Sequence, residues 1–327
     1  ATVIGIFQAV FATLLVDVVL IAVHFAMPDK LPLPAAIVLG AVASATAPAA
    51  TLMVVRQYKA KGPLTDILLP IVALDDAVGL VVFAVSFGVA KALISGHVDI
   101  LSVVVEPILE VVLSLLLGLV MGLLFTFFEK FFHSKSKRLS MSVTFVFLTV
   151  ALSMIKFEIF GIHIAFSSLL VCMMLGTIFC NICDFSEELM DRVDRWTAPL
   201  FILFFVISGA ELELSVFKDF AIVAIGLIYI LARSFGKYLG AYSSAKAVKC
   251  EKNIVKYLGI TLLPQAGVAL GMAIKAEQLG AEGAIVANIT LFGVLIYELI
   301  GPMLTKISLL KAGEIKPEEK TSARAKN

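Results

Sequence analysis

Long apolar runs separated by short polar loops make up most of this chain. An α-helix needs about 20 mainly apolar residues to cross the hydrocarbon core of a bilayer, because it rises ~1.5 Å per residue. On that scale the pattern predicts ten spanning segments, near residues 3–26, 33–55, 66–91, 100–128, 140–156, 160–180, 197–213, 219–245, 254–275 and 283–309. The expected fold class is an all-α polytopic membrane protein with about ten spanning helices.

The composition agrees with this pattern and narrows the function classes. Hydrophobic residues are 60% of the 327-residue chain and charged residues are 16%, and the mean hydropathy is +1.03. Such values are typical of polytopic membrane proteins and exclude a soluble domain. No nucleic-acid motif is present, and a lone Cys180-x-x-Cys183 pair is not enough for a metal site. We therefore expect no cofactor and no nucleic-acid partner.

Two adjacent carboxylates, Asp75 and Asp76, interrupt the third apolar segment. Asp75 lies about a dozen residues after Pro63, which places it roughly 18 Å along a helix. A charge at that depth costs at least ~2.5 kcal/mol and by default indicates an ion pathway or a proton relay. Because neighbouring helical residues point about 100° apart, each aspartate can have its own partner. The alternative interpretation is a polar pair buried against another helix.

Two breaks interrupt otherwise apolar segments. The segment 33–55 contains Thr46 and Pro48, and the segment 254–275 contains Pro264 and Gln265. Proline in a spanning helix frees a backbone carbonyl that protein, water or an ion must satisfy. The broken segments are an odd number of crossings apart, so they run in opposite directions. This favours an inverted repeat with two interrupted, crossing helices, which is typical of a midplane site in a secondary transporter. Two ordinary proline kinks are the alternative.

Three further charged residues lie in the later segments. Arg233 and Lys237, in segment 219–245, are four residues apart and share a helix face. Depth alone does not decide which of them pairs with the aspartates, and Lys237 could instead extend to the cytoplasmic interface. Glu298, in segment 283–309, is a secondary candidate; alternatively it only caps the helix end near Pro302.

Loop charge predicts the orientation and the division of the chain. Lysine and arginine gather in the loops after the even-numbered segments and in the C-terminal tail. The positive-inside rule then places these loops and the C-terminus in the cytoplasm, in a cell (inner or plasma) membrane. We expect residues 1–93 and 219–310 to form the two halves of an ion-translocation core, 94–218 to form interface helices, and 311–327 to form a short, mobile cytoplasmic tail.

Several of these stretches resemble the bacterial monovalent cation/proton antiporters, among them the NapA-type and NhaA-type sodium/proton exchangers. The stretches are Ala73-Leu74-Asp75-Asp76, the Thr46-x-Pro48 break, Gly236-Lys237-x-x-Gly240, and the run from Pro199 to Leu212. The resemblance covers the whole chain. Its specific part is the aspartate pair, because a proline break occurs in many membrane proteins.

The resemblance implies a site. Asp76 would carry the transported ion or the proton, Asp75 would pair with Lys237, and the branch with this Asp-Asp pair and a lysine is electrogenic. Ala47 stands where electroneutral relatives have an aspartate, whereas Gln265-Ala266-Gly267 departs from the Arg-Gly-Glu of many relatives. The resemblance also implies a homodimer, and it makes the first segment the family's third helix, so that two or three N-terminal helices are absent.

The expected function is exchange of Na⁺ or Li⁺ for H⁺ by a secondary active transporter, not an enzyme, through alternating access. The alternatives are a K⁺/H⁺ antiporter, a channel, and a sodium-coupled organic-anion symporter of similar fold, against which the Asp-Asp pair argues. An intramembrane aspartyl protease needs aspartates from two helices. The only other candidate, Asp17, lacks a glycine-flanked motif.

Overall fold

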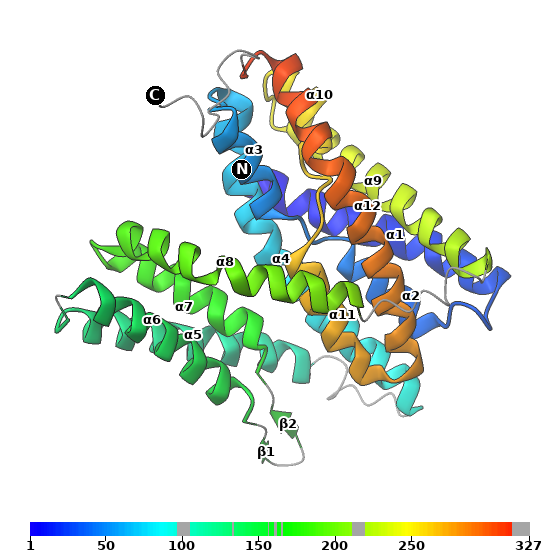
Figure 1. Ribbon diagram of the computed structural model, residues 1–327. Coiled ribbons are helices and arrows are strands. Elements are labelled where there is room, and N and C mark those ends of the chain that lie inside the picture. Colours follow the sequence, from blue (N-terminus) through cyan, green and yellow to red (C-terminus); the bar gives the residue numbers. More distant parts are fainter. Residues whose placement is uncertain are drawn as a thin grey trace. The chain divides into compact units, whose positions relative to one another are not determined.

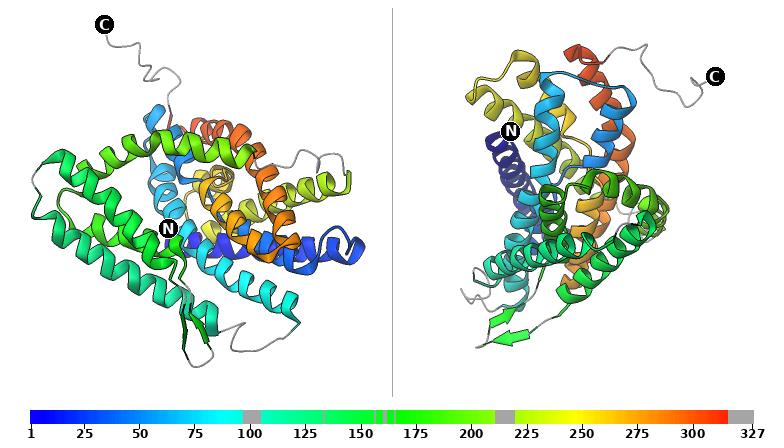
Figure 2. Two further views of the ribbon diagram at one scale, coloured as in Figure 1. Left: turned by 60° about the horizontal axis from the view of Figure 1, so that its bottom comes forward. Right: turned by 90° about the vertical axis from the view of Figure 1, so that its left-hand side faces the viewer.

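The structure is a computed structural model that describes residues 1–96, 105–132, 134–155, 157–159, 162–164, 166–210 and 220–315. It divides the chain into two compact units, whose elements are drawn in Figures 1 and 2. Unit 1 consists of Ala1–Ile94 and Leu212–Asn327, and unit 2 consists of Ser95–Glu211. The two ends of the chain therefore share one unit, and the middle of the chain forms the other.

Unit 1 is built from long helices and from two pairs of half-helices. The long helices are α1 (Thr2–Ala26), α4 (Pro63–Ser95), α9 (Phe220–Ala247) and α12 (Ala281–Ala312). The half-helices are α2 (Leu33–Val42) with α3 (Pro48–Gln57), and α10 (Lys252–Thr261) with α11 (Gly267–Ala276), which a single 3₁₀ turn (Glu277–Leu279) follows. Pro48 is the first residue of α3, where its missing N–H costs nothing. Both sequence-predicted breaks are therefore real interruptions between helices.

The described residues of unit 2 form four helices and one pair of strands, namely α5 (Glu106–Glu129), α6 (Lys135–Ser153), β1 (Phe157–Ile159), β2 (Ile162–Ile164), α7 (Ser168–Ile182) and α8 (Ser186–Ala210). The strands pair antiparallel, with Glu158 opposite His163. The expected helix over 160–180 is therefore wrong at its start, because aromatic and β-branched residues there favour strands. Helix α8 begins at Ser186, well before the expected start near residue 197.

The helical pattern agrees with a membrane protein. Within the part of the chain that the structure describes, five helices are long and apolar enough to cross a bilayer: α1, α4, Ile108–Glu129 of α5, α9 and α12. Each of the ten expected segments overlaps a helix or a pair of half-helices, the segment 160–180 only from Ser168 onward. The predicted fold class is confirmed, and within the described ranges the pair of strands is the departure from it. That α6, α7 and α8 also span the membrane stays a prediction.

The most extensive helix contact in unit 1 joins α1 to α9, the first helix to a late one (Figure 1). Two glycines of α9 make this close approach possible. A Cβ atom at Gly236 would lie 3.0 Å from Ala12 Cα, and one at Gly240 would lie 2.9 Å from Gln8 Cα. Small residues four apart let membrane helices pack backbone to backbone. This contact brings Gln8 of α1 beside the lysine that lies between the two glycines.

The N-terminus of α4 is capped by a residue from the far end of the chain. The carboxylate of Glu314 accepts hydrogen bonds from Leu64 N at 2.6 Å, Thr65 N at 2.8 Å and Thr65 Oγ1 at 2.7 Å. The first N–H groups of a helix have no partner within it, and a negative charge is favourable there. The first residues of the expected tail thus belong to unit 1; the rest of it, 316–327, lies outside the described residues.

Candidate ion-binding site

The two breaks lie against each other within unit 1. We call residues 43–47, between α2 and α3, the first break, and residues 262–266, between α10 and α11, the second break. Ala47 N donates to Pro264 O at 2.8 Å, and Gln265 Nε2 donates to Val42 O at 2.9 Å. Each break thus supplies partners for backbone groups that the other leaves free, which is the condition for irregular backbone at membrane depth.

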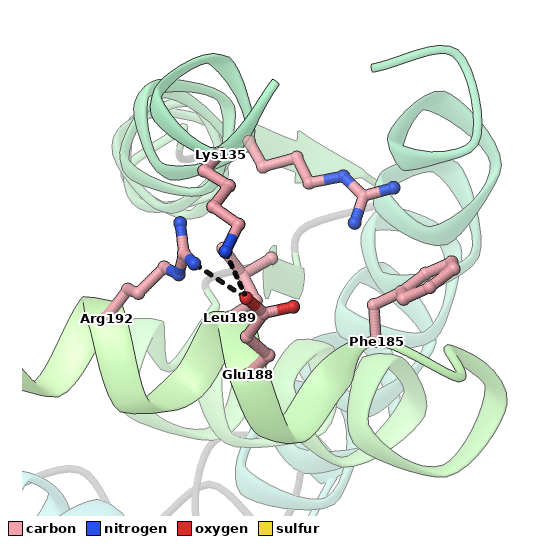
Figure 3. A pocket seen from close by; sticks show the side chains of 6 residues that line it. Lys135, Phe185, Glu188, Leu189 and Arg192 are labelled. Atoms are coloured by element: carbon pink, nitrogen blue, oxygen red, sulfur yellow. Dashed lines mark hydrogen bonds and ion pairs between the residues drawn. The ribbon is translucent and has the colours of Figure 1, made fainter. Parts of the chain in front are cut away.

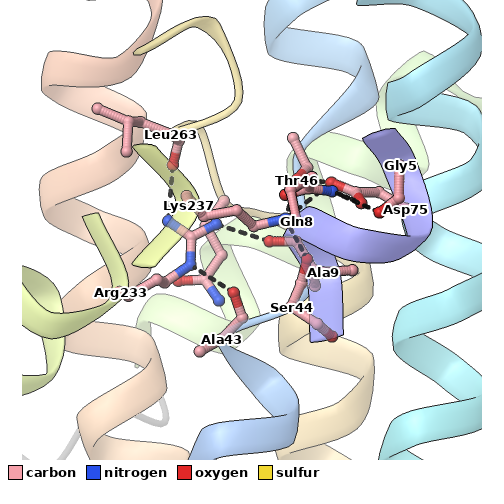
Figure 4. A network of polar contacts seen from close by, with 12 residues as sticks. Gly5, Gln8, Ala9, Ala43, Ser44, Thr46, Asp75, Arg233, Lys237 and Leu263 are labelled. Atoms are coloured by element: carbon pink, nitrogen blue, oxygen red, sulfur yellow. Dashed lines mark hydrogen bonds and ion pairs between the residues drawn. The ribbon is translucent and has the colours of Figure 1, made fainter. Parts of the chain in front are cut away.

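A buried ion pair lies beside the first break (Figure 4). Lys237 Nζ is 2.7 Å from Asp75 Oδ2, and both side chains are fully buried. The lysine also donates to Ser44 O and, at 2.9 Å, to Thr46 Oγ1. Asp75 accepts further hydrogen bonds from Gln8 Nε2 and from Thr46 Oγ1. Four elements therefore meet at Asp75: α1, the first break, α4 and α9.

Arg233, one turn before Lys237 on α9, has a different set of partners. Its guanidinium donates to three carbonyl oxygens, those of Ala43 at 3.1 Å, Ala45 at 2.6 Å and Leu263 at 2.8 Å. Its central carbon lies 4.4 Å from the centre of the Tyr297 ring. These carbonyls belong to the two breaks, within three residues of the C-terminal ends of α2 and α10, where helix dipoles place partial negative charge. Arg233 thus joins the two breaks, and among the described residues no ion pair links it to either aspartate.

Asp76 differs from Asp75 in having one carboxylate oxygen without a hydrogen-bond partner. Its Oδ1 is buried and has no hydrogen-bond partner. Gly79, one turn further along α4, faces the first break, because a Cβ there would lie 2.8 Å from Ser44 Oγ. This face of α4 therefore offers a carboxylate oxygen next to irregular backbone. Carboxylate and carbonyl oxygens are the ligands that hard cations prefer.

Comparison with known proteins identifies the family. The family model described as sodium/hydrogen exchanger, transmembrane, matches residues 3–311. The chain belongs to the sodium/hydrogen exchanger family. This is a family of transporters and not of enzymes, and the chain is a multi-pass membrane protein.

One curated protein resembles the chain in sequence, and one solved structure resembles it in fold. The Na(+)/H(+) antiporter NhaS4 from Synechocystis sp. is 25% identical over 167 residues, which are 50% of this chain and 40% of NhaS4. The match thus spans less than half of that relative. The structure of the sodium proton antiporter MjNhaP1 from Methanocaldococcus jannaschii has a TM-score of 0.70 at 18% identity, covering 95% of this chain and 77% of that chain. At that identity the likeness shows the exchanger fold.

Within this exchanger fold the structure brings together most of the sequence-predicted site residues. Asp75, Lys237 and Thr46 are in direct contact, and Pro264 and Gln265 brace the first break. Glu298 is half-buried on α12, and among the described residues no hydrogen bond or ion pair joins it to Asp75. Sequence reasoning missed Gln8, although a glutamine inside an apolar segment is a visible signal for a buried polar contact.

Unit 2 holds a separate surface group of charges, where a small pocket lies between the starts of α6 and α8 (Figure 3). Glu188 Oε1 is 3.3 Å from Lys135 Nζ and 2.6 Å from Arg192 Nη2. The hydrogen bond from Lys135 and the two positive charges lower the pKa of Glu188 below its ordinary value. The group is solvated and its charges are paired, which is typical of an exposed helix junction rather than an ion site.

Proposed function

We propose that this protein exchanges Na⁺ or Li⁺ for H⁺ across the membrane and that Asp76 carries the exchanged ion. The observation that supports this most is the contrast between two adjacent carboxylates. Asp75 is saturated by Lys237, Thr46 and Gln8, whereas Asp76 Oδ1 is buried with no partner. An unsatisfied carboxylate in a spanning helix is a functional site by default.

The exchange follows from competition for one carboxylate. Asp76 can hold a proton or a hard cation that takes oxygen ligands, but not both at once. Loading a cation therefore releases a proton, and loading a proton releases the cation. When the neighbouring Asp75 also takes part in binding, its pair with Lys237 breaks and the lysine gives up its own proton. More protons than cations then move in each cycle, which makes the exchange electrogenic.

Alternating access needs a part that carries the site and a part that stays in place. The whole candidate site belongs to unit 1, and unit 2 is compact by itself. We infer that unit 1 is the moving ion-translocation core and that unit 2 provides the interface helices of a homodimer. The loop charges support a cytoplasmic C-terminus.

The test is proton-gradient dissipation in proteoliposomes that contain the protein, with Na⁺, Li⁺ and K⁺ added in turn. We expect Na⁺ and Li⁺ to collapse the gradient and Asp76→Asn to abolish the response. Asp66→Asn is the matched control, because it makes the same chemical change at an exposed position of the same helix. A response driven by K⁺ alone would make the protein a K⁺/H⁺ antiporter.

Charge movement is tested in the same vesicles by clamping the membrane potential. Wild-type exchange is expected to depend on voltage, and Lys237→Gln is expected to keep cation exchange while losing that dependence. Normal exchange by Asp76→Asn would show that the site lies elsewhere.

A further inference from the structure

Asp17 is a third acidic residue at membrane depth, and the exchange described above does not use it. It is the only Asp, Glu, Lys or Arg in α1. It lies nine residues before the end of α1 at Ala26, which is ~14 Å from that end of the helix. An ionisable residue at this depth is costly to keep without a partner or a function.

The carboxylate of Asp17 is packed against a glycine of the neighbouring half-helix. Its Oδ1 is buried and has no hydrogen-bond partner. A Cβ atom at Gly40 of α2 would overlap this oxygen, so the carboxylate occupies the space that a side chain would fill. The absence of a side chain at Gly40 therefore allows Asp17 to reach the backbone of α2.

The end of α2 is an unfavourable place for an uncompensated negative charge. Gly40 lies in the last turn of this half-helix, where the dipole places partial negative charge. In an unbroken helix Ser44 N would donate to Gly40 O. Here Ser44 N donates to Ala41 O instead, because the first break begins. A proton or a cation at Asp17 would remove this conflict.

The basic side chains of the surrounding helices have hydrogen-bond or ion-pair partners other than Asp17, or they are exposed. On α9, Arg233 binds carbonyls of the breaks and Lys237 binds Asp75. On α1 itself, His24 Nδ1 lies 2.8 Å from Leu31 O. Helix α2 has no charged residue. Helix α4, which also packs against α1, has one basic residue, Lys91, and its side chain is exposed. Among the described residues, no ion pair involves Asp17.

The position of Asp17 relates it to the candidate site. Gln8, which binds Asp75, lies nine residues before Asp17 on α1, so Asp17 is ~14 Å further toward the Ala26 end of the helix. The loop charges place that end on the outer side of the membrane. Asp17 therefore lies between the level of the aspartate pair and the outer solution.

We propose that Asp17 is a second exchangeable proton site, which takes up and releases a proton on the outer side of the aspartate pair. In the release step the O–H bond of the Asp17 carboxylic acid breaks, the proton passes to water, and the carboxylate remains; uptake is the reverse. The direction of this traffic rests on the proposed exchange function, whereas the presence of an exchangeable proton on Asp17 does not.

The first test is infrared spectroscopy of the purified full chain and does not need transport. The C=O band of a buried carboxylic acid should shift when H₂O is replaced by D₂O and should disappear on raising the pH. Asp17→Asn is expected to remove one such band, and the exposed control Asp66→Asn to remove none. Gly40→Ala should displace the Asp17 band, because it pushes the carboxylate away from α2. A full set of bands in Asp17→Asn would overturn the proposal.

The second test is the pH dependence of exchange in proteoliposomes, with the pH on each side varied separately. Asp17→Asn is close to the protonated acid in shape and should fold, and it is expected to lose one titrating step in the outer pH profile only. Asp17→Glu should restore that step at a shifted pH. An unchanged outer profile, with the infrared band lost, would make Asp17 a structural acid and refute its place on the path. If wild type exchanges nothing, the function proposed above fails, while the infrared result still decides whether Asp17 holds an exchangeable proton.

Discussion

The two breaks in unit 1 are flanked by similar elements but make different polar contacts. Each separates two half-helices, and each has a proline in or beside it: Pro48 follows the first break as the first residue of α3, and Pro264 lies within the second. The first break contacts the ion pair directly, through Thr46 on Asp75 and Lys237 and through the carbonyl of Ser44. The second break, among the described residues, makes its polar contacts beyond α10 and α11 with Ala47 of the first break, with Val42 at the end of α2, with Arg233 and with Tyr229.

The first break thus contacts the ion pair of the proposed site, whereas the second break contacts the backbone around the first. A proline in each helix is therefore not evidence that both breaks bind the ion. The distinction lies in the side chains: a threonine hydroxyl in the first break reaches the aspartate, whereas the glutamine of the second break donates to a backbone carbonyl at the end of α2.

The largest expected loss of stability comes from replacing Lys237, whose ion pair with Asp75 lies beside the first break. Lys237→Gln leaves Asp75 buried without its counter-charge, and breaking a buried ion pair typically costs about 3–5 kcal/mol. Thermal unfolding in detergent should show this loss. The double variant Asp75→Asn/Lys237→Gln should recover most of the stability, since neither charge remains. A double variant as unstable as the sum of both single changes would mean that the two residues act independently.

A smaller loss is expected from Arg233, which joins the two breaks. Arg233→Gln has two amide N–H donors for the three carbonyls, so at least one carbonyl loses its partner, and one hydrogen bond from a charged group is worth about 1.5–3 kcal/mol. We expect a loss of about that size, measured by the same unfolding assay. Arg233→Lys is the matched control: it keeps the charge but not the planar fork, and should recover only part of the loss. Full recovery would show that charge alone holds the breaks together.

The smallest losses of stability are expected from Gln265→Leu and Thr46→Val, and these two variants best distinguish the roles of the two breaks. Gln265→Leu loses the bond to Val42 O and should cost about 0.6–1.7 kcal/mol, as interhelical hydrogen bonds in membranes do. Thr46→Val should cost a similar amount. Their effects on exchange should differ, because only Thr46 contacts Asp75: Thr46→Val is expected to raise the KM for Na⁺ and Gln265→Leu to leave it unchanged. Equal shifts in KM would contradict the division between ligand and brace.

Much of the helical layout was predictable, because runs of apolar residues and their prolines carry that information locally. The ten segments, both interruptions and the acidic pair at membrane depth all follow from patterns within a few dozen residues. The pair of strands was missed because a short apolar run of aromatic and β-branched residues does not distinguish a strand from the start of a spanning helix.

The partners within the site were harder to predict, since they depend on which helices are neighbours. Depth could not choose between Arg233 and Lys237, which lie one turn apart. The two side chains have different partners in the structure: Lys237 binds Asp75, and Arg233 binds carbonyl oxygens of the two breaks. The role of Gln8 depends on glycines more than 200 residues away, which no local pattern reveals.

The pairing of Asp75 with Lys237 also has a consequence for how the chain is made. The two residues are 162 positions apart, and ribosomes add about 5–20 residues per second, so the aspartate is made roughly 8–30 s before its lysine. During that interval α4 is already present while α9 does not yet exist. A bare carboxylate is costly in lipid, so α4 is expected to reach its final packing only after α9 has brought Lys237 to Asp75. The last step in assembling the site is then the joining of a late helix to an early one.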